Sequence, residues 1–340
     1  MSAAMHAPAA RPLVSVLLAS RDGARHLDEA LASLTAQTYA EVELVLVDDG
    51  SRDETLAILA RFAASHPRAT VIHAGGGGLA AALAQAAAQA SGDLLARHDD
   101  DDRSHPERLA RQVEFLASHA SVGVVGTGAE IIDDAGARIA TYPVPTDETA
   151  MRRMLRRAPP FVHGSVMMRR DVYRRAGGYR GAFRASQDLD LWMRLPADAG
   201  LANLPDPLYA WRHHPRGVFS RARDEQLFYA AVARAFRDER AATGSDAIAL
   251  LERSADPAAF IAAYPRAAQL ERYLGEAYVR EGRPADARRH LAHALADPDE
   301  RGAALGWWLT SWPVAFTPRA RRAAARAGSA AGAAARSAGA

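Results

Sequence analysis

The sequence contains no cysteine and no lysine, and it has no long apolar run. Without cysteine the chain has no disulfide, no thiolate metal site and no cysteine nucleophile. No window reaches the roughly 18 apolar residues that a membrane span requires, and residues 1–12 lack the apolar core of a signal peptide. We therefore expect a cytoplasmic protein, with peripheral attachment at the inner face of the cytoplasmic membrane left open.

The charge of the chain is nearly balanced. Its 340 residues include 42 basic residues, all of them arginine, and 40 acidic ones, which gives a formal net charge of +2. This balance offers no basis for general nucleic-acid binding, so we expect no nucleic-acid partner. With 49% hydrophobic residues, the chain can bury one large core and still carry an appendage.

The first part of the chain alternates short apolar runs with segments of helical periodicity. The apolar runs predict buried strands at 13–19, 42–47, 70–73 and 93–97. Helices between such strands predict a parallel sheet that is covered on both faces. In sheets of this kind, ligands bind outside the carboxyl ends of the strands.

After about residue 120 the pattern changes to shorter strands, polar loops and finally helices. Strands are expected at 122–125, 129–132, 138–141 and 203–212, with helices at 149–157 and after Ser186, which is a candidate N-cap. Residues 221–318 read as helical, and 273–298 has the spacing of one tetratricopeptide-like helical pair. Residues 1–12 and the basic, Ala/Gly-rich tail 319–340 are expected to be disordered.

The tryptophan-rich segment 305–316 is followed by several arginines up to Arg326. One interpretation is that 305–326 contacts a membrane surface, with tryptophans at the headgroups beside the cations. The other is that the tryptophans pack over the helical pair.

Two acidic clusters stand at the predicted strand ends. Asp48 and Asp49 follow the second strand, and Asp99, Asp100, Asp101 and Asp102 follow the fourth. Adjacent carboxylates repel one another, whereas a divalent cation takes carboxylate oxygens as ligands and reverses that penalty. The alternative is a solvated acidic turn before a helix. The position at the carboxyl edge of a parallel sheet favours the metal-binding interpretation.

The ordered set of motifs from Val14 to about Ser220 resembles the family-2 inverting glycosyltransferases, which have the GT-A fold. The segments that carry the resemblance are 14–21, 37–39, 45–51, 96–102, 105–109, 187–192 and 211–214. The resemblance implies an α/β domain over 13–220, with a Rossmann-like, mostly parallel sheet flanked by helices. The helical region 221–318 is then a C-terminal appendage.

The resemblance also implies an activity. It is the transfer of a hexose from a nucleotide-diphosphate sugar, a UDP-sugar foremost, to a glycan or lipid-linked acceptor of cell-envelope polysaccharide synthesis. Mn²⁺ or Mg²⁺ would stabilise the leaving diphosphate. The alternative is an inactive transferase-like module that binds sugar nucleotides or acts as a scaffold. It stays open because the helix over 79–90 lacks the polar residues usual in relatives, and Gly75–Gly78 would then offer backbone amides to the diphosphate.

On the donor side, the resemblance assigns the nucleotide to the first two strand ends. Asp49 or Ser51 could instead cap the following helix. Asp101 is expected to hold the metal and Asp99 the sugar or ribose hydroxyls, because alternate residues of an extended segment face the same way. Asp100 is counted among the nucleotide-sugar-binding residues, although its side chain would point away from the side that Asp99 and Asp101 share. Asp102 would support the loop or reach the metal through water. The nucleotide-sugar-binding residues are Ala19, Ser20, Arg21, Asp48, Asp49, Asp99, Asp100 and Arg212, and the metal residues are Asp101 and His214.

On the acceptor side, Asp188 is the expected general base. Its alternative role is an interaction with the helix macrodipole. Gln187 stands where relatives usually carry Glu, and His163 is expected near the acceptor and the diphosphate. Trp192 is either an acceptor-sugar platform or a core residue.

Two other acidic motifs fit less well. A haloacid-type phosphatase needs Thr or Val soon after its second Asp, where this chain has Arg103 and Ser104. An EF-hand counted from Asp99 needs Gly at its sixth position and Glu at its twelfth, where Ser104 and Ala110 stand.

Overall fold

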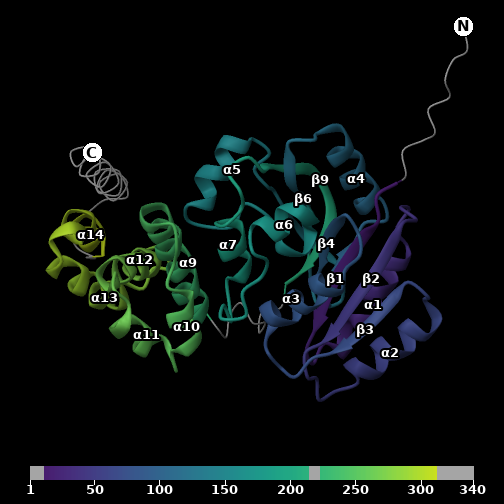
Figure 1. Cartoon of the computed structure of the whole chain (residues 1–340), viewed down its shortest axis with the longest axis horizontal. Helices are drawn as coiled ribbons and strands as arrows, with labels where there is room; N and C mark the ends of the chain where they lie inside the picture. Colours follow the sequence, from purple (N-terminus) through teal and green to yellow (C-terminus); the bar gives the residue numbers. More distant parts are fainter. Residues whose placement is uncertain (1–10, 214–222, 312–340) are drawn as a thin grey trace, which may run out of the picture. The chain divides into compact units, whose positions relative to one another are not determined.

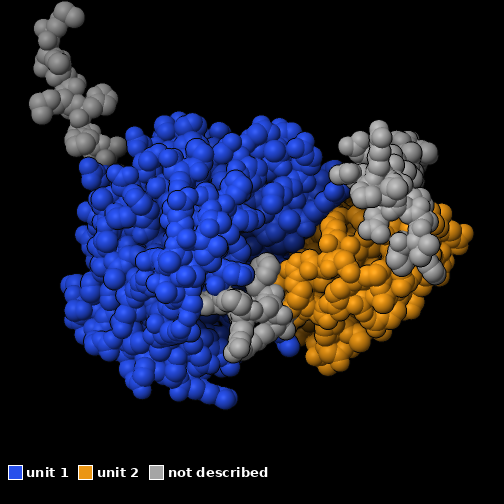
Figure 2. All heavy atoms as spheres, turned by 180° about the vertical axis from the view of Figure 1, so that it is seen from behind, with its two compact units in different colours: residues 1–221 blue, residues 222–340 orange. Residues whose placement is uncertain are grey.

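The computed structural model describes residues 11–213 and 223–311. The chain divides into two compact units, residues 1–221 and 222–340, which Figure 2 shows in different colours. Figure 1 shows a first unit of strands and helices and a second unit of helices alone. The α/β class with a C-terminal helical appendage, expected from the sequence, is confirmed.

The first unit holds the predicted alternation of strands and helices. Its elements are β1 (Val14–Ser20), α1 (Ala24–Thr35), β2 (Val42–Asp48), α2 (Thr55–Ser65), β3 (Ala69–His73), α3 (Leu79–Gln89), β4 (Leu94–His98), β5 (Arg103–Ser104), α4 (Arg108–Ser118), β6 (Val122–Ile132), β7 (Arg138–Tyr142), α5 (Glu148–Leu155), η1 (His163–Ser165), β8 (Met167–Arg169), α6 (Arg170–Arg175), α7 (Gln187–Trp192) and β9 (Gly200–Arg212). The two strands expected at 122–125 and 129–132 are one continuous strand.

The strands form one sheet in the order β3-β2-β1-β4-β8-β6-β9-β5, with β7 on β6. The longest ladders, β1–β2, β1–β4, β2–β3 and β6–β9, are all parallel, whereas β8 runs antiparallel to β4 and β6. The mostly parallel sheet is therefore confirmed. Because β1, β2 and β4 are parallel, Ser20, Asp48 and His98 end their strands at the same edge.

Side chains alternate between the two faces of the central strands, and each face has its own helices. Leu17 and Ala19 belong to an apolar cluster with residues of α3, α5, α6 and α7. Val16 and Leu18 belong to the other cluster, with residues of α1, α2 and α4. Burial on both faces explains why the strands read as continuous apolar runs.

The second unit is helical, with α9 (Arg223–Thr243), α10 (Ile248–Arg253), α11 (Pro257–Ala263), α12 (Ala267–Arg280), α13 (Pro284–Ala296) and α14 (Pro298–Thr310). The helices α12 and α13 occupy the segment of the expected helical pair. The guanidinium of Arg280 lies 5.0 Å from the ring centre of Trp307, while Leu305 and Leu309 are exposed. Among the described helices, none combines the length and the apolar character needed to cross a bilayer.

Gly275 allows α12 and α13 to approach closely. A Cβ atom at this position would stand 2.5 Å from Cγ of Leu291. Gly275→Val should therefore lower the free energy of unfolding by about 1–3 kcal/mol, the usual cost of overpacking. Gly302 in α14 has no neighbouring atom within 4 Å of its would-be Cβ, so Gly302→Ala should stabilise by about 0.5–1 kcal/mol. Urea unfolding followed by circular dichroism measures both changes, and an unchanged Gly275→Val midpoint would contradict the close packing.

Candidate active site

Asp49 presents an open acceptor at the end of β2. It is 3% exposed, and its Oδ2 accepts a hydrogen bond from the backbone N–H of Gly78 at 2.9 Å. Its Oδ1 is buried and has no hydrogen-bond partner among the described residues. An unpaired buried carboxylate oxygen is costly, so this atom is suited to a donor group of a ligand.

The helix-capping alternative for Asp49 and Ser51 is wrong. The helix α2 begins only at Thr55, and Glu54 occupies its N-cap position. Ser51 Oγ instead accepts from the backbone N–H of Asp22 at 3.1 Å. This contact joins the turn after β1 to the turn after β2.

Asp48 supports that turn from inside. It is fully buried, with Oδ2 2.8 Å from Nδ1 of His73 and Oδ1 accepting from the backbone N–H of Ser51 at 3.2 Å. The expected nucleotide contact by Asp48 is therefore wrong, because both of its oxygens are engaged within the chain. The N–H of Gly78 is likewise taken by Asp49 and is not left for a diphosphate.

The turn after β1 holds the other nucleotide candidates. Ala19 and Ser20 are buried at the end of the strand, and Arg21 is exposed. The carbonyl of Ser20 accepts from the backbone N–H of Asp49 at 2.8 Å. The structure therefore brings the first and second strand ends together, as the sequence predicts.

The four aspartates after β4 form a turn rather than an extended segment, with the turn at Asp100 and Asp101. The alternating-face argument for Asp99 and Asp101 is therefore wrong in its premise. Each carboxylate has its own surroundings. Asp99 pairs with Arg97, Asp100 accepts from the hydroxyl of Ser20, and Asp102 accepts from a backbone N–H at 2.7 Å.

The charges of Asp99 and Asp101 nevertheless influence one another. Burial and then the charge of Asp99 raise the pKa of Asp101 to about 6. Burial and then Asp101 raise the pKa of Asp100 to about 7, and burial with Asp99 and Asp101 raises the pKa of Asp102 well above its usual range. Burial opposes the charge of Asp99 as well, but Arg97 and its other cationic neighbours lower its pKa overall. The loop is thus short of positive charge.

Two buried residues that hold this loop were not singled out from the sequence as site residues. Arg97 lies inside β4, is 3% exposed and makes the ion pair with Asp99. Tyr209 of β9 accepts from the backbone N–H of Asp99 at 3.1 Å, and its hydroxyl also bonds Asp102. The sequence signal for Arg97 is an arginine within a buried apolar strand, because a buried charge needs a partner.

Arg212 is a structural clamp, so its expected contact with the nucleotide sugar is wrong. Its side chain is 1% exposed. Nε donates to the carbonyl of Asp101 at 2.7 Å, Nη1 to the carbonyls of residues 133 and 134 at 2.9 Å, and Nη2 to Glu29. Its backbone N–H is the donor to Asp102. These bonds leave the guanidinium buried and engaged, so it fixes the acidic loop instead of binding substrate.

Asp188 opens α7 and is half-buried. No hydrogen bond or ion pair engages its carboxylate within residues 11–213 and 223–311. His163 lies within electrostatic reach of both Asp188 and Asp99, and burial followed by Arg97 lowers the pKa of His163. The 3-10 turn that carries His163 fits against the acidic loop because a Cβ at Gly164 would stand 2.6 Å from a carboxylate oxygen of Asp99.

Tyr179 is a further candidate site residue that was not singled out from the sequence. Its hydroxyl lies 2.8 Å from Nε2 of His163. Burial raises the pKa of Tyr179, and the negative charges of Asp188 and Asp99 raise it further. The bonded pair of His163 and Tyr179 is therefore influenced by the charges of both the expected base and the acidic loop.

A buried ion cluster holds α7 and the turn before Tyr179. Asp190 accepts from Nε of Arg180 at 3.0 Å and from Nη2 of Arg194 at 2.8 Å. Arg194 also donates to the carbonyls of Ala176 and Gly178. Asp190 therefore serves the fold, and it positions Asp188 and Tyr179 through the two arginines.

Trp192 is a core residue, so its placement as an acceptor-sugar platform is wrong. It is 1% exposed and packs edge-on against Phe161, with ring centres 5.2 Å apart. Gln187 is buried beside Asp188. Ser186 adopts a left-handed conformation with φ 52° and does not cap α7 through its side chain, contrary to expectation.

The donor set partly fits a divalent cation. The carboxylate of Asp101 lies where positive charge is lacking, so it suits a hard cation. However, no group of three or more metal-binding side chains forms among the described residues. A cation here would therefore need ligands beyond these side chains. The second expected ligand, His214, lies outside the described residues.

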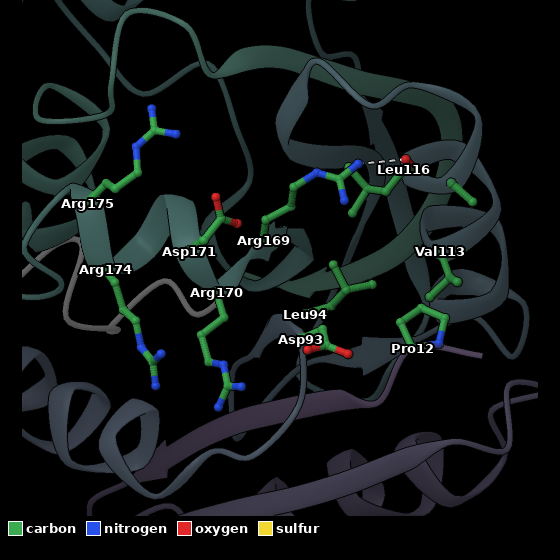
Figure 3. Close-up of a pocket in the computed structure, with 11 residues that line it drawn as sticks. Pro12, Asp93, Leu94, Val113, Leu116, Arg169, Arg170, Asp171, Arg174 and Arg175 are labelled. Carbon is green, nitrogen blue, oxygen red and sulfur yellow. Dashed lines mark hydrogen bonds between the residues drawn. The ribbon is translucent and has the colours of Figure 1, made fainter. Parts of the chain in front are cut away.

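A separate pocket of about 500 Å³ lies at the opposite edge of the sheet, where β4 begins at Leu94 (Figure 3). Four arginines of 169–175 surround it, and Arg169 points to Leu116, whose carbonyl it reaches at 2.7 Å. Arg170 donates to the carbonyl of Ala90 at 3.0 Å. This pocket adjoins the amino ends of the strands, so it is distinct from the site built by residues 19–21, 49 and 99–102.

Comparison with known proteins identifies the family. Residues 15–177 match the family model described as glycosyl transferase family 2. The EpsE protein of Bacillus subtilis (strain 168) is 38% identical over 206 residues, which cover 59% of this chain and 73% of that protein. The chain belongs to glycosyl transferase family 2. The amylovoran biosynthesis glycosyltransferase AmsE of Erwinia amylovora is 31% identical over 198 residues, covering 57% of this chain and 73% of AmsE.

Solved structures show the same fold for this glycosyltransferase. S. aureus TarS 1–349 in complex with UDP-GlcNAc matches with a TM-score of 0.57 at 18% identity, covering 92% of this chain and 90% of TarS 1–349. The mannosyltransferase PcManGT from Pyrobaculum calidifontis in complex with GDP-Man and Mn²⁺ matches with a TM-score of 0.55 at 22% identity, covering 96% and 88%. The resemblance to GT-A glycosyltransferases of family 2 is thereby confirmed.

Proposed function

We propose that this glycosyltransferase transfers a hexose with inversion in one displacement, with Asp188 as the general base. The acceptor hydroxyl oxygen bonds to the anomeric carbon as the bond from that carbon to the diphosphate breaks, and the hydroxyl proton passes to Asp188. The observation that carries this proposal is the half-buried Asp188 carboxylate, which lacks a described partner and lies beside the His163–Tyr179 pair. A carboxylate held in reach of substrate is suited to this proton transfer.

The acidic loop is the proposed site of the leaving diphosphate. Mn²⁺ or Mg²⁺, held by Asp101, would act there as a Lewis acid that stabilises the developing charge. Ser20, Arg97 and Arg212 fix the neighbouring carboxylates and so hold Asp101 in place. The Mn²⁺ in PcManGT supports this assignment on the same fold.

Asp49 favours uridine over guanosine in the donor. Uracil offers a single ring N–H between two carbonyl acceptors, whereas guanine offers a ring N–H and an adjacent amino group. Asp49 has only Oδ1 open, because Gly78 holds Oδ2. One open acceptor matches the one donor of uracil, and the UDP-GlcNAc complex of TarS, which has the same fold, supports this preference.

The acceptor is proposed to be a glycan or lipid-linked saccharide of surface polysaccharide synthesis. AmsE, and the O-antigen biosynthesis glycosyltransferase WbnJ of Escherichia coli, which is 29% identical, carry such names. The exposed Leu305 and Leu309 on one side of α14 support a membrane-surface contact by 305–326 at the inner face of the cytoplasmic membrane. The open carboxylates of Asp49 and Asp188 favour catalysis over an inactive scaffold.

A thermal-shift screen with MnCl₂ tests the donor assignment. UDP and UDP-sugars should raise the melting temperature more than GDP and GDP-sugars. Asp49→Ala should weaken UDP binding about 10- to 100-fold, because a hydrogen bond to a charged acceptor contributes about 1.5–3 kcal/mol. Glu54→Ala is the matched control, since Glu54 is exposed in the same turn and makes no capping bond. A larger shift with GDP, or an Asp49→Ala variant with unchanged affinity, would contradict the assignment.

A further inference from the structure

His163 contacts both parts of the proposed reaction site. The 3-10 turn that begins with it packs on the acidic loop, since a Cβ atom at Gly164 would stand 2.6 Å from Oδ2 of Asp99. Its imidazole ring lies edge-on to the ring of Trp192, with ring centres 6.5 Å apart. Trp192 belongs to α7, the helix that also carries Asp188. His163 and its turn therefore bridge the loop assigned to the leaving diphosphate and the helix of the expected base.

One ring nitrogen of His163 is occupied, and the other is open. Nε2 lies 2.8 Å from the hydroxyl oxygen of Tyr179. Nδ1 makes no hydrogen bond within residues 11–213 and 223–311, and it is not one of the buried side-chain atoms that lack a partner. A ligand can therefore reach Nδ1.

Both members of the bonded pair are neutral. Burial, followed by the charge of Arg97, lowers the pKa of His163, so the imidazole is uncharged near pH 7. Burial raises the pKa of Tyr179, so its hydroxyl keeps its proton. A neutral imidazole has one N–H and one acceptor nitrogen, and the hydrogen bond made by one nitrogen decides which of them carries the proton.

Only one of the two possible arrangements pairs the Tyr179 hydroxyl fully. If Nε2–H donated to the Tyr179 oxygen, the phenolic O–H would lack a described acceptor in a side chain that is 7% exposed. An unpaired buried donor is costly. If the Tyr179 hydroxyl donates to Nε2 instead, one bond pairs both groups, and the ring proton of His163 resides on Nδ1.

We propose that His163 donates Nδ1–H to a hydroxyl oxygen of the transferred sugar, and that Tyr179 is the positioning residue that holds the ring in this tautomer. This inference rests on the proposed glycosyl transfer. In a single displacement the sugar lies between the attacking and the leaving oxygen, which is the region between the proposed base and the acidic loop. The ionised carboxylates of Asp99 and Asp188 only accept hydrogen bonds, so Nδ1–H supplies the donor that they lack. The contact selects a sugar that has a hydroxyl at this position.

Nuclear magnetic resonance of the full-length protein with isotope-labelled histidine tests the tautomer, because protonated and unprotonated ring nitrogens resonate at different frequencies. The signal of His163 is identified by its loss in His163→Asn. The wild type should carry the proton on Nδ1, and Tyr179→Phe, which removes only the hydroxyl, should show a mixture of both tautomers. Tyr142→Phe is the matched control, because Tyr142 is exposed and its hydroxyl makes no described bond. A wild type with the proton on Nε2 overturns the proposal.

Isothermal titration calorimetry with UDP, UDP-glucose, UDP-galactose and UDP-GlcNAc in MgCl₂ tests the contact with the sugar. His163→Ala should bind the UDP-sugar that the wild type prefers about two- to tenfold more weakly, the contribution of one neutral hydrogen bond, with an unchanged affinity for UDP. His163→Asn should retain most of the affinity, because the amide nitrogen of asparagine takes the place of Nδ1. His163→Gln, whose amide nitrogen takes the place of Nε2, should lose it.

The affinity for UDP separates this inference from the proposed function. A loss confined to the UDP-sugar in His163→Ala, with rescue by His163→Asn, supports the contact. An unchanged UDP-sugar affinity in His163→Ala overturns it, as does an equal loss for UDP and the UDP-sugar. A wild type that binds neither UDP nor any of the UDP-sugars would instead contradict the proposed function, and the spectrum of His163 then decides the tautomer by itself.

Discussion

Asp188→Asn should lower the rate of sugar transfer by about a hundredfold to ten-thousandfold, the usual contribution of a positioned general base. Asparagine has nearly the same shape as aspartate but cannot take the acceptor proton. The substitution removes no described hydrogen bond or ion pair, because Asp188 makes none within residues 11–213 and 223–311. The fold and the donor site should therefore remain intact. UDP release from a UDP-sugar, with and without saccharide acceptors, measures the rate.

The control for this prediction is Asp198→Asn. Asp198 is a surface carboxylate with a side chain that is 71% exposed, and it pairs with Arg175. This variant should transfer at the wild-type rate, and both variants should keep the wild-type melting temperature and UDP shift. Transfer by Asp188→Asn at a wild-type rate would remove Asp188 as the base. Nuclear magnetic resonance of the product tests the stereochemistry, where retention of configuration would contradict a single displacement.

Asp190→Ala should destabilise the first unit by about 3–5 kcal/mol, the usual cost of removing one partner from a buried ion pair. The carboxylate of Asp190 is 1% exposed and neutralises Arg180 and Arg194, which are 15% and 8% exposed. Alanine removes the carboxylate that neutralises both guanidinium groups in a site of low solvent access. Activity should fall as well, because the same arginines hold the turn that presents Tyr179.

Asp28→Ala is the matched control for Asp190→Ala. Asp28 also pairs with an arginine, Arg61, but both side chains are mostly exposed, at 72% and 66%. Such a surface pair contributes about 0–1 kcal/mol, so its loss should hardly move the unfolding midpoint. Urea unfolding of both variants makes the comparison. Equal midpoints for the two would show that the Asp190 cluster is not structural.

The sequence pattern was sufficient to predict the features that depend on a single strand or on the order of strands. Apolar runs predicted the central strands, and parallel order then required Ser20, Asp49 and Asp99 to meet at one edge. The geometry of that edge agrees, since Asp49 bonds the backbone of Ser20 and Asp100 bonds its hydroxyl. Pattern was insufficient for the aspartates themselves, because a turn at Asp100 and Asp101 replaced the extended segment.

The wrong assignments share one physical cause, which is competition among partners that are distant in sequence. Arg212 has the chemistry of a phosphate ligand, yet Glu29, the acidic loop and the turn at 133–134 already engage it. Trp192 has the chemistry of a sugar platform, yet Phe161 and the helix core enclose it. Side-chain type limits what a residue can do, whereas its neighbours decide whether it is available.

The sequence by itself determined the α/β class and the edge of the sheet at which the candidate carboxylates lie. These follow from the periodicity of apolar residues and from the parallel order of strands, both of which are local or nearly local properties. Only the tertiary structure decided which carboxylate oxygens stay open, that His163 bonds Tyr179, and that the turn carrying His163 packs on the acidic loop. Each of these features depends on segments from different parts of the chain, and only the folded backbone brings those segments near one another.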